Sequence, residues 1–300
     1  MVKMSVFLTP KQVSRAIQVS ESSVKRWCDK GIIPTQYTAG GHRRIALSEL
    51  IEFLRSSKHQ LVRPEVLGLP STTGQTVWVI DRAAEQVTEA LLKGDEEQCR
   101  QIILDLYLAE HCISSICDLV IAKAFSNIGD RWECGKAEVY QERYGCEVSL
   151  RVLHELRTLI PNPPADAPVA IGGTPEGDQY SLPTTMVELV LRDSKWNAVS
   201  LGTNLPFATL RAAILQHRPR IFWLSVSHII DDQNFIREYT ELYDEFGLDV
   251  AFVAGGRGMT ESIRQQIQYS AFCDNVRHLE SFAQTIKNTT EKNADRNQSL

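Results

Sequence analysis

Residues 169–186, with the sequence VAIGGTPEGDQYSLPTTM, constrain the fold of this chain more than any other stretch. The apolar run 169–171 suits a short buried strand, the glycines and prolines that follow predict a loop, and helical spacing begins near Leu182. In open parallel α/β sheets, ligands bind beside the loops that leave the carboxyl ends of the strands. Asp178 and Tyr180 lie in this loop, so we expect both side chains to face a ligand.

Alternation of strands and helices continues from this stretch to residue 287. Candidate strands cover residues 169–172, 198–201, 221–226 and 249–254, with a weaker fifth at 275–278, and candidate helices cover 182–193, 206–216, 233–246, 260–268 and 279–287. This alternation predicts a Rossmann-like, doubly wound parallel sheet over residues 168–287. The polar residues 288–300 are expected to be a disordered tail.

Helical periodicity dominates the middle of the chain. The helical segments lie near residues 82–93, 95–110, 112–130 and 136–160. Four helices with short loops predict a four-helix bundle over residues 82–160, and the turn-rich residues 64–81 are expected to form a linker before it. On the last helix, Tyr140, Tyr144, Val148 and Val152 form one stripe, which we expect to lie in the core.

The first 63 residues differ in charge from the rest of the chain. They hold eleven Lys or Arg and four Asp or Glu, a net charge of +7, whereas the whole chain carries −5 and the remainder therefore −12. A basic segment on an acidic body predicts a nucleic-acid contact that is confined to residues 1–63.

Two short helices are predicted in this basic head from their end signals. Thr9 and Pro10 suit the start of the first helix, Ser20 can cap the second, and Gly31 suits the left-handed end of the second. So tight a connection predicts a helix-turn-helix. The second helix carries short polar and basic groups that suit base edges and phosphates, namely Ser22, Ser23, Lys25 and Arg26.

A basic hairpin, or wing, is predicted next. Gly40 and Gly41 would make its tip, Ser48 would cap a third helix, and the candidate DNA contacts of the wing are Tyr37, His42, Arg43 and Arg44. Residues 8–54 closely resemble the MerR/excisionase family of winged helix-turn-helix domains, most specifically through the GGHRR of the wing. The resemblance implies binding to a double-stranded DNA operator. Since so short a recognition helix reads few bases, we expect a homo-oligomer, a dimer or a tetramer. The alternative is a basic helical domain that does not bind DNA.

A second resemblance begins in the bundle. The phrase IGDRWE at residues 128–133, followed by QER at 141–143, resembles the helical cap of cobalamin-binding domains. In the CarH/LitR light-sensing repressors, a Trp that shields the upper face of the corrin is followed ten positions later by Glu-His, and the His can ligate cobalt after photolysis. Trp132 and Glu142 match that pattern, whereas Arg143 replaces the histidine.

The loops of the C-terminal domain are similar to those of cobalamin-binding Rossmann-like domains. In that family the nucleotide tail of the corrinoid runs beside small residues, which the resemblance places at Ser225, Ser227, Gly255 and Gly256. All these loops follow in order after a bundle and a winged head, so the resemblance to CarH/LitR repressors spans nearly the whole chain.

The opening loop of that domain departs from the family pattern. The family's Asp/Glu-x-His-x-x-Gly becomes Asp178, Tyr180 and Pro183 here. Neutral imidazole is a good cobalt donor, whereas a phenol is mostly protonated near neutral pH and donates poorly. We therefore do not expect a histidine-ligated cobalamin. Tyr180 as a simple packing replacement is equally open, and His228 is a minor candidate ligand that we otherwise interpret as a polar loop residue.

These features predict a transcriptional regulator with a repurposed sensory pocket. The pocket would hold a cobalamin without histidine ligation, another tetrapyrrole or chromophore, or no ligand at all, with signalling through oligomerisation. The alternatives are an adenosylcobalamin-dependent photoreceptor repressor and a cobalamin-dependent enzyme subunit. We expect no enzymatic activity and no metal-ligand set, because the sequence shows no Ser-His-Asp, paired-carboxylate, HExxH or CxxC arrangement.

The sequence also bears on the compartment. No apolar run approaches the roughly 20 residues of a membrane span, and the first residues lack the apolar segment of a signal peptide. We expect a cytoplasmic protein with no membrane partner, in which the seven cysteines are reduced and mostly buried.

Overall fold

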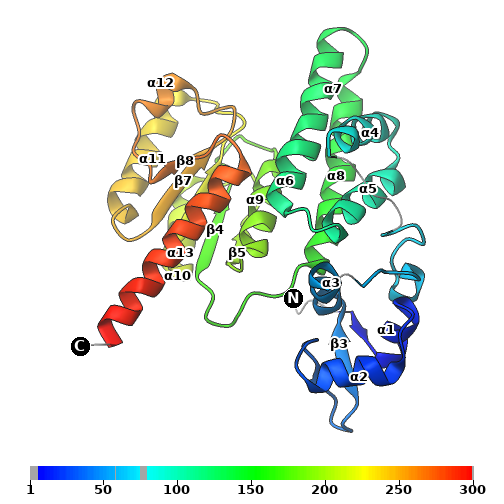
Figure 1. Cartoon of the computed structure of the whole chain (residues 1–300). Coiled ribbons are helices and arrows are strands. Elements are labelled where there is room, and N and C mark those ends of the chain that lie inside the picture. Colours follow the sequence, from blue (N-terminus) through cyan, green and yellow to red (C-terminus); the bar gives the residue numbers. More distant parts are fainter. Residues whose placement is uncertain (1–5, 58, 75–79, 299–300) are drawn as a thin grey trace. The chain divides into compact units, whose positions relative to one another are not determined.

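The computed structural model describes residues 6–57, 59–74 and 80–298, and the chain divides into two compact units, Met1–Pro161 and Asn162–Leu300. The predicted fold class is confirmed: a helix-turn-helix and a helical bundle make up the first unit, and a Rossmann-like parallel sheet makes up the second (Figure 1). Within the described residues, no helix has both the length and the apolar content that crossing a membrane requires. Parts of the predicted linker and tail, 75–79 and 299–300, lie outside the described residues.

The head is a small helical domain with a three-stranded antiparallel sheet in the order β1-β3-β2. Its elements are β1 (Phe7–Leu8), α1 (Pro10–Ala16), α2 (Glu21–Asp29), β2 (Gln36–Tyr37), β3 (Arg43–Ala46) and α3 (Leu47–Ser56). The predicted caps are confirmed, because the Thr9 hydroxyl accepts from Gln12 N, the Ser20 hydroxyl accepts from Ser23 N, and Gly31 has a φ of +68°.

The prediction that Ser48 caps the third helix is wrong. The helix already begins at Leu47, so Ser48 lies inside its first turn and is buried. Ala46 is the N-cap and offers no side-chain acceptor. The reason is tertiary: Ala46 pairs with Phe7 in the sheet and Leu47 N donates to Val6 O, so strand pairing determines where the helix starts.

The segment that we predicted as a linker is packed where the structure describes it. Pro64–Leu67 forms a 3-10 turn, η1, and Leu67 and Leu69 are buried. Just before it, the backbone N–H groups of Val62 and Arg63 donate to the carbonyl of Ala16 in α1. Residues 62–69 are therefore hydrogen-bonded and partly buried rather than an open linker.

The bundle contains the four predicted helical segments. They are α4 (Ile80–Lys93), α5 (Glu96–Leu108), the continuous run of α6 (Ile113–Ile116), π-helical η2 (Cys117–Ala122) and α7 (Lys123–Glu133), and α8 (Val139–Leu159). The stripe predicted as core on α8 is only half right. Val148 and Val152 are buried, but Tyr140 is 71% and Tyr144 50% exposed. The periodicity is correct, but the first turns of α8 are exposed and the helix enters the core only from Gly145 onward.

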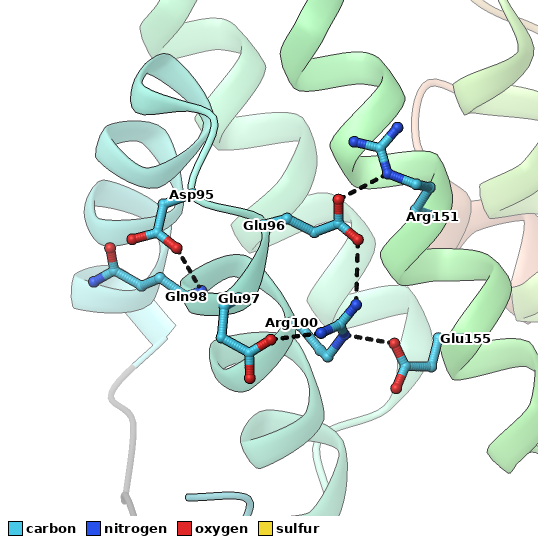
Figure 2. A network of polar contacts seen from close by, with 7 residues as sticks. All are labelled: Asp95, Glu96, Glu97, Gln98, Arg100, Arg151 and Glu155. Atoms are coloured by element: carbon cyan, nitrogen blue, oxygen red, sulfur yellow. Dashed lines mark hydrogen bonds and ion pairs between the residues drawn. The ribbon is translucent and has the colours of Figure 1, made fainter. Parts of the chain in front are cut away.

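An arginine links α5 to α8 on the outside of the bundle (Figure 2). The Arg100 guanidinium makes ion pairs with Glu96, Glu97 and Glu155 at 3.2, 2.5 and 2.7 Å. Arg151 of α8 reaches back to Glu96 at 2.8 Å. A shared network of this kind restrains two helices more effectively than an isolated surface pair, which contributes little.

The second unit is a five-stranded parallel sheet in the order β5-β4-β6-β7-β8. Its strands are β4 (Val169–Gly173), β5 (Asn197–Ser200), β6 (Ile221–Ser225), β7 (Ala251–Gly255) and β8 (Ala271–Phe272), and its helices are α9 (Ser181–Asp193), α10 (Phe207–His217), α11 (Asp232–Phe246), α12 (Glu261–Arg264) and α13 (Val276–Gln298). Two apolar clusters form its core, one containing Phe222 and Phe252 and the other containing Trp196 and Trp223.

Two predictions near the C-terminus are wrong. The fifth strand is β8 rather than 275–278, where α13 begins, because the Asn275 side chain accepts from His278 N and so starts a helix. The residues expected to be a disordered tail continue α13 as far as Gln298. They contain neither Pro nor Gly, so nothing in them breaks the helix.

Candidate functional site

The recognition helix α2 presents the predicted polar groups on the surface of the head. Val24 and Cys28 are buried, and the side chains of Ser22, Lys25 and Arg26 are exposed. Ser22 and Ser23 each place a hydroxyl 2.9 Å from the Ser20 hydroxyl. These hydroxyls stabilise the first turn of α2, in addition to any contact that they make with DNA bases.

The wing exists as predicted. Strands β2 and β3 pair antiparallel, and Gly41 N donates to Thr38 O at the tip. Tyr37 is 56% exposed and His42 is also exposed, so both are accessible on the surface of the head.

One of the two wing arginines already has a partner in the head. The Arg43 guanidinium donates twice to Asp29 Oδ1 at the end of α2, at 2.7 and 3.0 Å, and lies 5.8 Å from the Tyr37 ring centroid. The hydrogen bond to Asp29 raises the pKa of Arg43, so its charge is firmly held. Arg43 therefore fastens the wing to α2, whereas the Arg44 guanidinium donates to the Arg43 carbonyl at 3.1 Å. Contact of either arginine with phosphate stays a prediction.

The predicted cap residues lie around the connection between α7 and α8. Trp132 at the end of α7 is 54% exposed, and Val139 and Tyr140 at the start of α8 are also exposed. Glu142 is half-buried and Arg143 exposed. This corner of the bundle thus shows an apolar, largely aromatic surface. A role of Trp132 in shielding a corrin stays a prediction.

Asp178 is the centre of the polar contacts at the carboxyl end of the sheet. It is fully buried, and its Oδ2 accepts from the N–H groups of Ser227 and His228 at 2.5 and 3.2 Å. Its Oδ1 accepts from Tyr180 N at 3.0 Å. The carboxylate therefore joins the loop after β4 to the loop after β6, whatever its role toward a ligand.

Asn204 and Thr174, which we did not predict as site residues, complete this arrangement. Asn204 Oδ1 accepts from Gly177 N at 2.8 Å, and Asn204 N lies 3.0 Å from both Thr174 Oγ1 and Asp178 O. Asn204 has a φ of +58°, a conformation that Asn tolerates better than most residues. The only sequence signal was an Asn soon after a Gly in a loop, which does not indicate its partner.

Tyr180 is half-buried at the same end, and the Arg257 guanidinium lies 5.3 Å from its ring centroid. Arg257 follows the glycine pair after β7 and was also not predicted as a site residue. Tyr180, Arg257 and the exposed His228 therefore come from three different loops of one sheet edge.

The glycine pair is explained by the protein's own backbone. A Cβ on Gly255 would lie 2.5 Å from Cys273 O, and a Cβ on Gly256 would lie 2.3 Å from Val226 O. Gly256 also has a φ of +109°. Ser225 is buried one residue before Val226. Small residues are required here for packing, so their presence alone does not indicate a bound nucleotide tail.

The side chains at this end include the Tyr180 phenol, the His228 imidazole and an engaged carboxylate, beside backbone groups. Within the described ranges, no group of three or more His, Cys, Asp or Glu side chains lies close enough to hold a metal ion. The arrangement suits recognition of a polar or flat molecule by hydrogen bonding and stacking.

Comparison with known protein families finds two matches in the first unit. The profile of a helix-turn-helix domain matches residues 7–58, and that of a B12 binding domain matches residues 83–157. The two together support a DNA-binding domain joined to a B12-binding domain. Comparison with proteins of curated function finds no match.

Solved structures support the fold. The monomethylamine corrinoid protein of Methanosarcina barkeri is 14% identical over 68% of this chain and 98% of its own, with a TM-score of 0.58. A cobalamin-binding protein from Desulfitobacterium hafniense is 16% identical over 70% of this chain and 99% of its own, with a TM-score of 0.40. The methanol:cobalamin methyltransferase complex of Methanosarcina barkeri is 16% identical over 75% and 89%, with a TM-score of 0.38. At 14% identity, the first likeness shows only that the fold is shared. The other two have TM-scores below 0.5, and we draw no conclusion from them.

Proposed function

We propose that this chain is a DNA-binding transcriptional regulator whose B12-binding-type module senses a corrinoid or another flat chromophore without a histidine ligand from the protein. The observation that carries the proposal is the presence, in one chain, of a winged helix-turn-helix and a bundle that matches a B12 binding domain. We propose no catalytic activity for it. Fold likeness to corrinoid proteins does not by itself assign a reaction.

Packing between the head and the bundle supports a coupled response. The Arg55 guanidinium of α3 lies 3.9 Å from the centroid of the buried Tyr107 ring in α5, and it donates to His111 O at 3.3 Å. Gly74 N donates to Asp105 Oδ1, also in α5. A ligand that favours one arrangement of the bundle would therefore act on a head that is attached to it. In our proposal the head changes its position or its pairing with a second copy, and the recognition helix itself is unchanged.

Sensing without a histidine ligand follows from the residues at positions 178–180. Asp178 is bonded to three backbone N–H groups, and Tyr180 stands where the resemblance expects the lower ligand. A phenol is a weak donor to cobalt near neutral pH. When bound, a corrinoid would supply light absorption and an exchangeable upper ligand. Tyr180 and Arg257 are the residues of the sheet end that would hold it, and Trp132 is the bundle residue that the resemblance implies for shielding it.

DNA binding is tested by fluorescence anisotropy on a duplex selected from random sequence. Arg44→Ala should weaken specific and non-specific binding alike and reduce the slope of log K against log salt concentration by about 0.9, because one phosphate contact is lost. Arg82→Ala, at an exposed position of α4, is the matched control and should change neither. A change in sequence preference with an unchanged salt slope would contradict the assignment of Arg44 to phosphate.

Ligand binding is tested by the absorbance spectrum of protein purified from its native host, which distinguishes corrin, bilin, haem and empty protein. If a corrin is present, Tyr180→His should tighten the binding of adenosylcobalamin and produce a histidine-ligated spectrum that the unmodified chain lacks. Such a spectrum from the unmodified chain would refute our proposal and favour the adenosylcobalamin photoreceptor alternative.

The size of the protein in solution tests the signalling step. Molecular mass and operator affinity, each measured with ligand present and removed, in darkness and in light, should change together. If neither changes, the module acts only as a dimerisation scaffold, which remains the alternative.

A further inference from the structure

The wing of the head is a hairpin with little pairing of its own. Strand β2 has two residues, and its register with β3 places Gln36 opposite Arg44 and Tyr37 opposite Arg43. Strand β1 pairs with the next two residues of β3, beyond the part that pairs with β2. A two-stranded pairing of this size is marginally stable in water. The position of the wing beside the recognition helix α2 therefore depends on side-chain contacts outside the ladder.

Strand alternation directs one of the two wing arginines toward α2. Successive side chains of a strand point to opposite faces, so Arg43 shares a face of β3 with the fully buried Ile45, whereas Arg44 lies on the other face. The Arg43 guanidinium donates to Asp29 Oδ1 through Nε at 3.0 Å and through Nη2 at 2.7 Å. The ring of Tyr37, opposite on β2, lies 5.8 Å from the same guanidinium. A single arginine thus joins both strands of the wing to the end of α2.

Asp29 lies where an acidic residue is otherwise unfavourable. It is the last residue of α2, and the C-terminal end of a helix carries partial negative charge, so a carboxylate there destabilises the helix. It also belongs to the basic head, on the helix that exposes Lys25 and Arg26, where a negative charge repels a phosphate. Half of its side chain is exposed, so packing does not require it. The favourable contact of this carboxylate is the ion pair with Arg43.

We propose that Asp29 is a positioning residue for DNA binding, which acts through Arg43 to hold the wing at a fixed place beside α2. Ordering a flexible segment and its side chains on binding costs free energy, and a wing that is already in place avoids part of that cost. The acidic residue therefore strengthens DNA binding, which is opposite to the effect of its charge alone. This role rests on the DNA binding proposed above.

The affinity of the full chain for the selected duplex tests this role. Asp29→Asn keeps the size of the side chain and removes its charge, and it should weaken binding about threefold because the wing is less firmly placed. Glu21→Gln is the matched control, since Glu21 is also on α2 and pairs with a cation, Lys25, at 2.8 Å, but that cation is on the same helix rather than on the wing. The control should bind as tightly as the unmodified chain or slightly more tightly. Tighter or unchanged binding by Asp29→Asn, or equal weakening by both variants, would overturn the inference.

A second background shows whether Asp29 acts through Arg43. Arg43→Ala alone should weaken binding at least as much as Asp29→Asn. In the Arg43→Ala chain, adding Asp29→Asn should weaken binding no further, because the two residues contribute through one contact. The same threefold loss in both backgrounds would show that Asp29 acts independently of Arg43 and would refute the positioning role.

The Arg43 side chain reports on the contact directly. In the full chain labelled with ¹⁵N-arginine, its Nε–H resonance, assigned by its loss in Arg43→Ala, should exchange slowly with water in the unmodified protein and faster in Asp29→Asn. The difference should persist when the duplex is bound, because Asp29 keeps its partner in the complex. Slow exchange in both bound chains would show that a phosphate replaces Asp29, and would refute the role.

Failure of this role is separable from failure of DNA binding itself. If no duplex selected from random sequence binds the unmodified chain, the proposed function and the role of Asp29 are refuted together. If the unmodified chain binds a duplex and Asp29→Asn binds it equally well, only the role of Asp29 is refuted.

Discussion

At the carboxyl end of the C-terminal sheet, Asp178 accepts hydrogen bonds from the backbone of Tyr180, Ser227 and His228. At the amino end of the same sheet, Trp196 is buried and its N–H has no acceptor in the part of the chain that the structure describes. One end uses its buried carboxylate to hold two loops together, the loop after β4 and the loop after β6. At the other end, Trp196 and the basic residues Lys195, Arg220 and Lys287 line a cavity of about 340 Å³.

The two ends also differ in how they use left-handed backbone. At the carboxyl end, positive φ falls on Gly177, Gly202 and Gly256, and on Asn204, whose side chain accepts a hydrogen bond from a neighbouring loop. At the amino end it falls on Lys195 and Arg218. We conclude that the resemblance of the loops to a ligand-binding family describes mainly how the carboxyl end of the sheet is built.

The largest expected effect comes from removing the carboxylate at the carboxyl end. Asp178→Ala would leave three backbone N–H groups without their acceptor and should lower the free energy of unfolding of the sheet by about 3 kcal/mol. Glu176→Ala, an exposed position of the same loop, should change it by no more than about 0.5 kcal/mol. Hydrogen–deuterium exchange of β4 and β6 peptides across a urea series measures both. Similar values for the two variants would mean that Asp178 does not hold the loops together.

The two buried tryptophans provide the next comparison. Trp223→Phe removes the hydrogen bond to Thr184 as well as indole volume and should cost about 2 kcal/mol. Trp196→Phe removes similar volume but no hydrogen bond, and should cost about 1 kcal/mol less. The same exchange measurement, applied to both variants, tests the difference. A larger loss in Trp196→Phe would indicate that its N–H already has a strong acceptor.

Relief of backbone strain at the amino end should raise the free energy of unfolding, by less than the losses expected above. Lys195→Gly and Arg218→Gly each place glycine at a positive φ, and each should raise the free energy of unfolding by about 0.5–1 kcal/mol. Thermal unfolding of the two variants beside the unmodified chain gives the sign. Destabilisation by Lys195→Gly alone would mean that the lysine side chain contributes more to packing than its backbone costs.

The smallest effect concerns Cys273, next to the carboxyl end. Burial, together with repulsion by Asp274, raises the pKa of its thiol to about 11. Because the thiol stays protonated at pH 8, iodoacetamide should label it at least about a hundredfold more slowly than an ordinary exposed cysteine, and the rate should rise with pH up to about 11. Cys134, which is exposed, serves as the internal reference in peptide mass spectrometry. Comparable labelling of the two at pH 8 would show that this end opens to solvent.

Local features of the sequence predicted the elements and the fold class. The caps at Thr9 and Ser20 and the left-handed Gly31 act within one helix and its nearest residues, so they can be recognised without knowing the rest of the chain. The same holds for the β-branched runs that became β4 and β6. Errors arose where a distant partner determined the outcome, as when strand pairing with Phe7 moved the start of α3 ahead of Ser48.

The polar contacts at both ends of the sheet were decided only by the tertiary structure. Asp178 meets N–H groups 49 and 50 residues away, and the cavity is lined by residues from Pro164 to Lys287. Sequence periodicity shows that a strand exists, but the order β5-β4-β6-β7-β8 determines which strand ends become neighbours. A hydrogen bond depends on that neighbourhood to within a few tenths of an ångström, and no local pattern of residues specifies it.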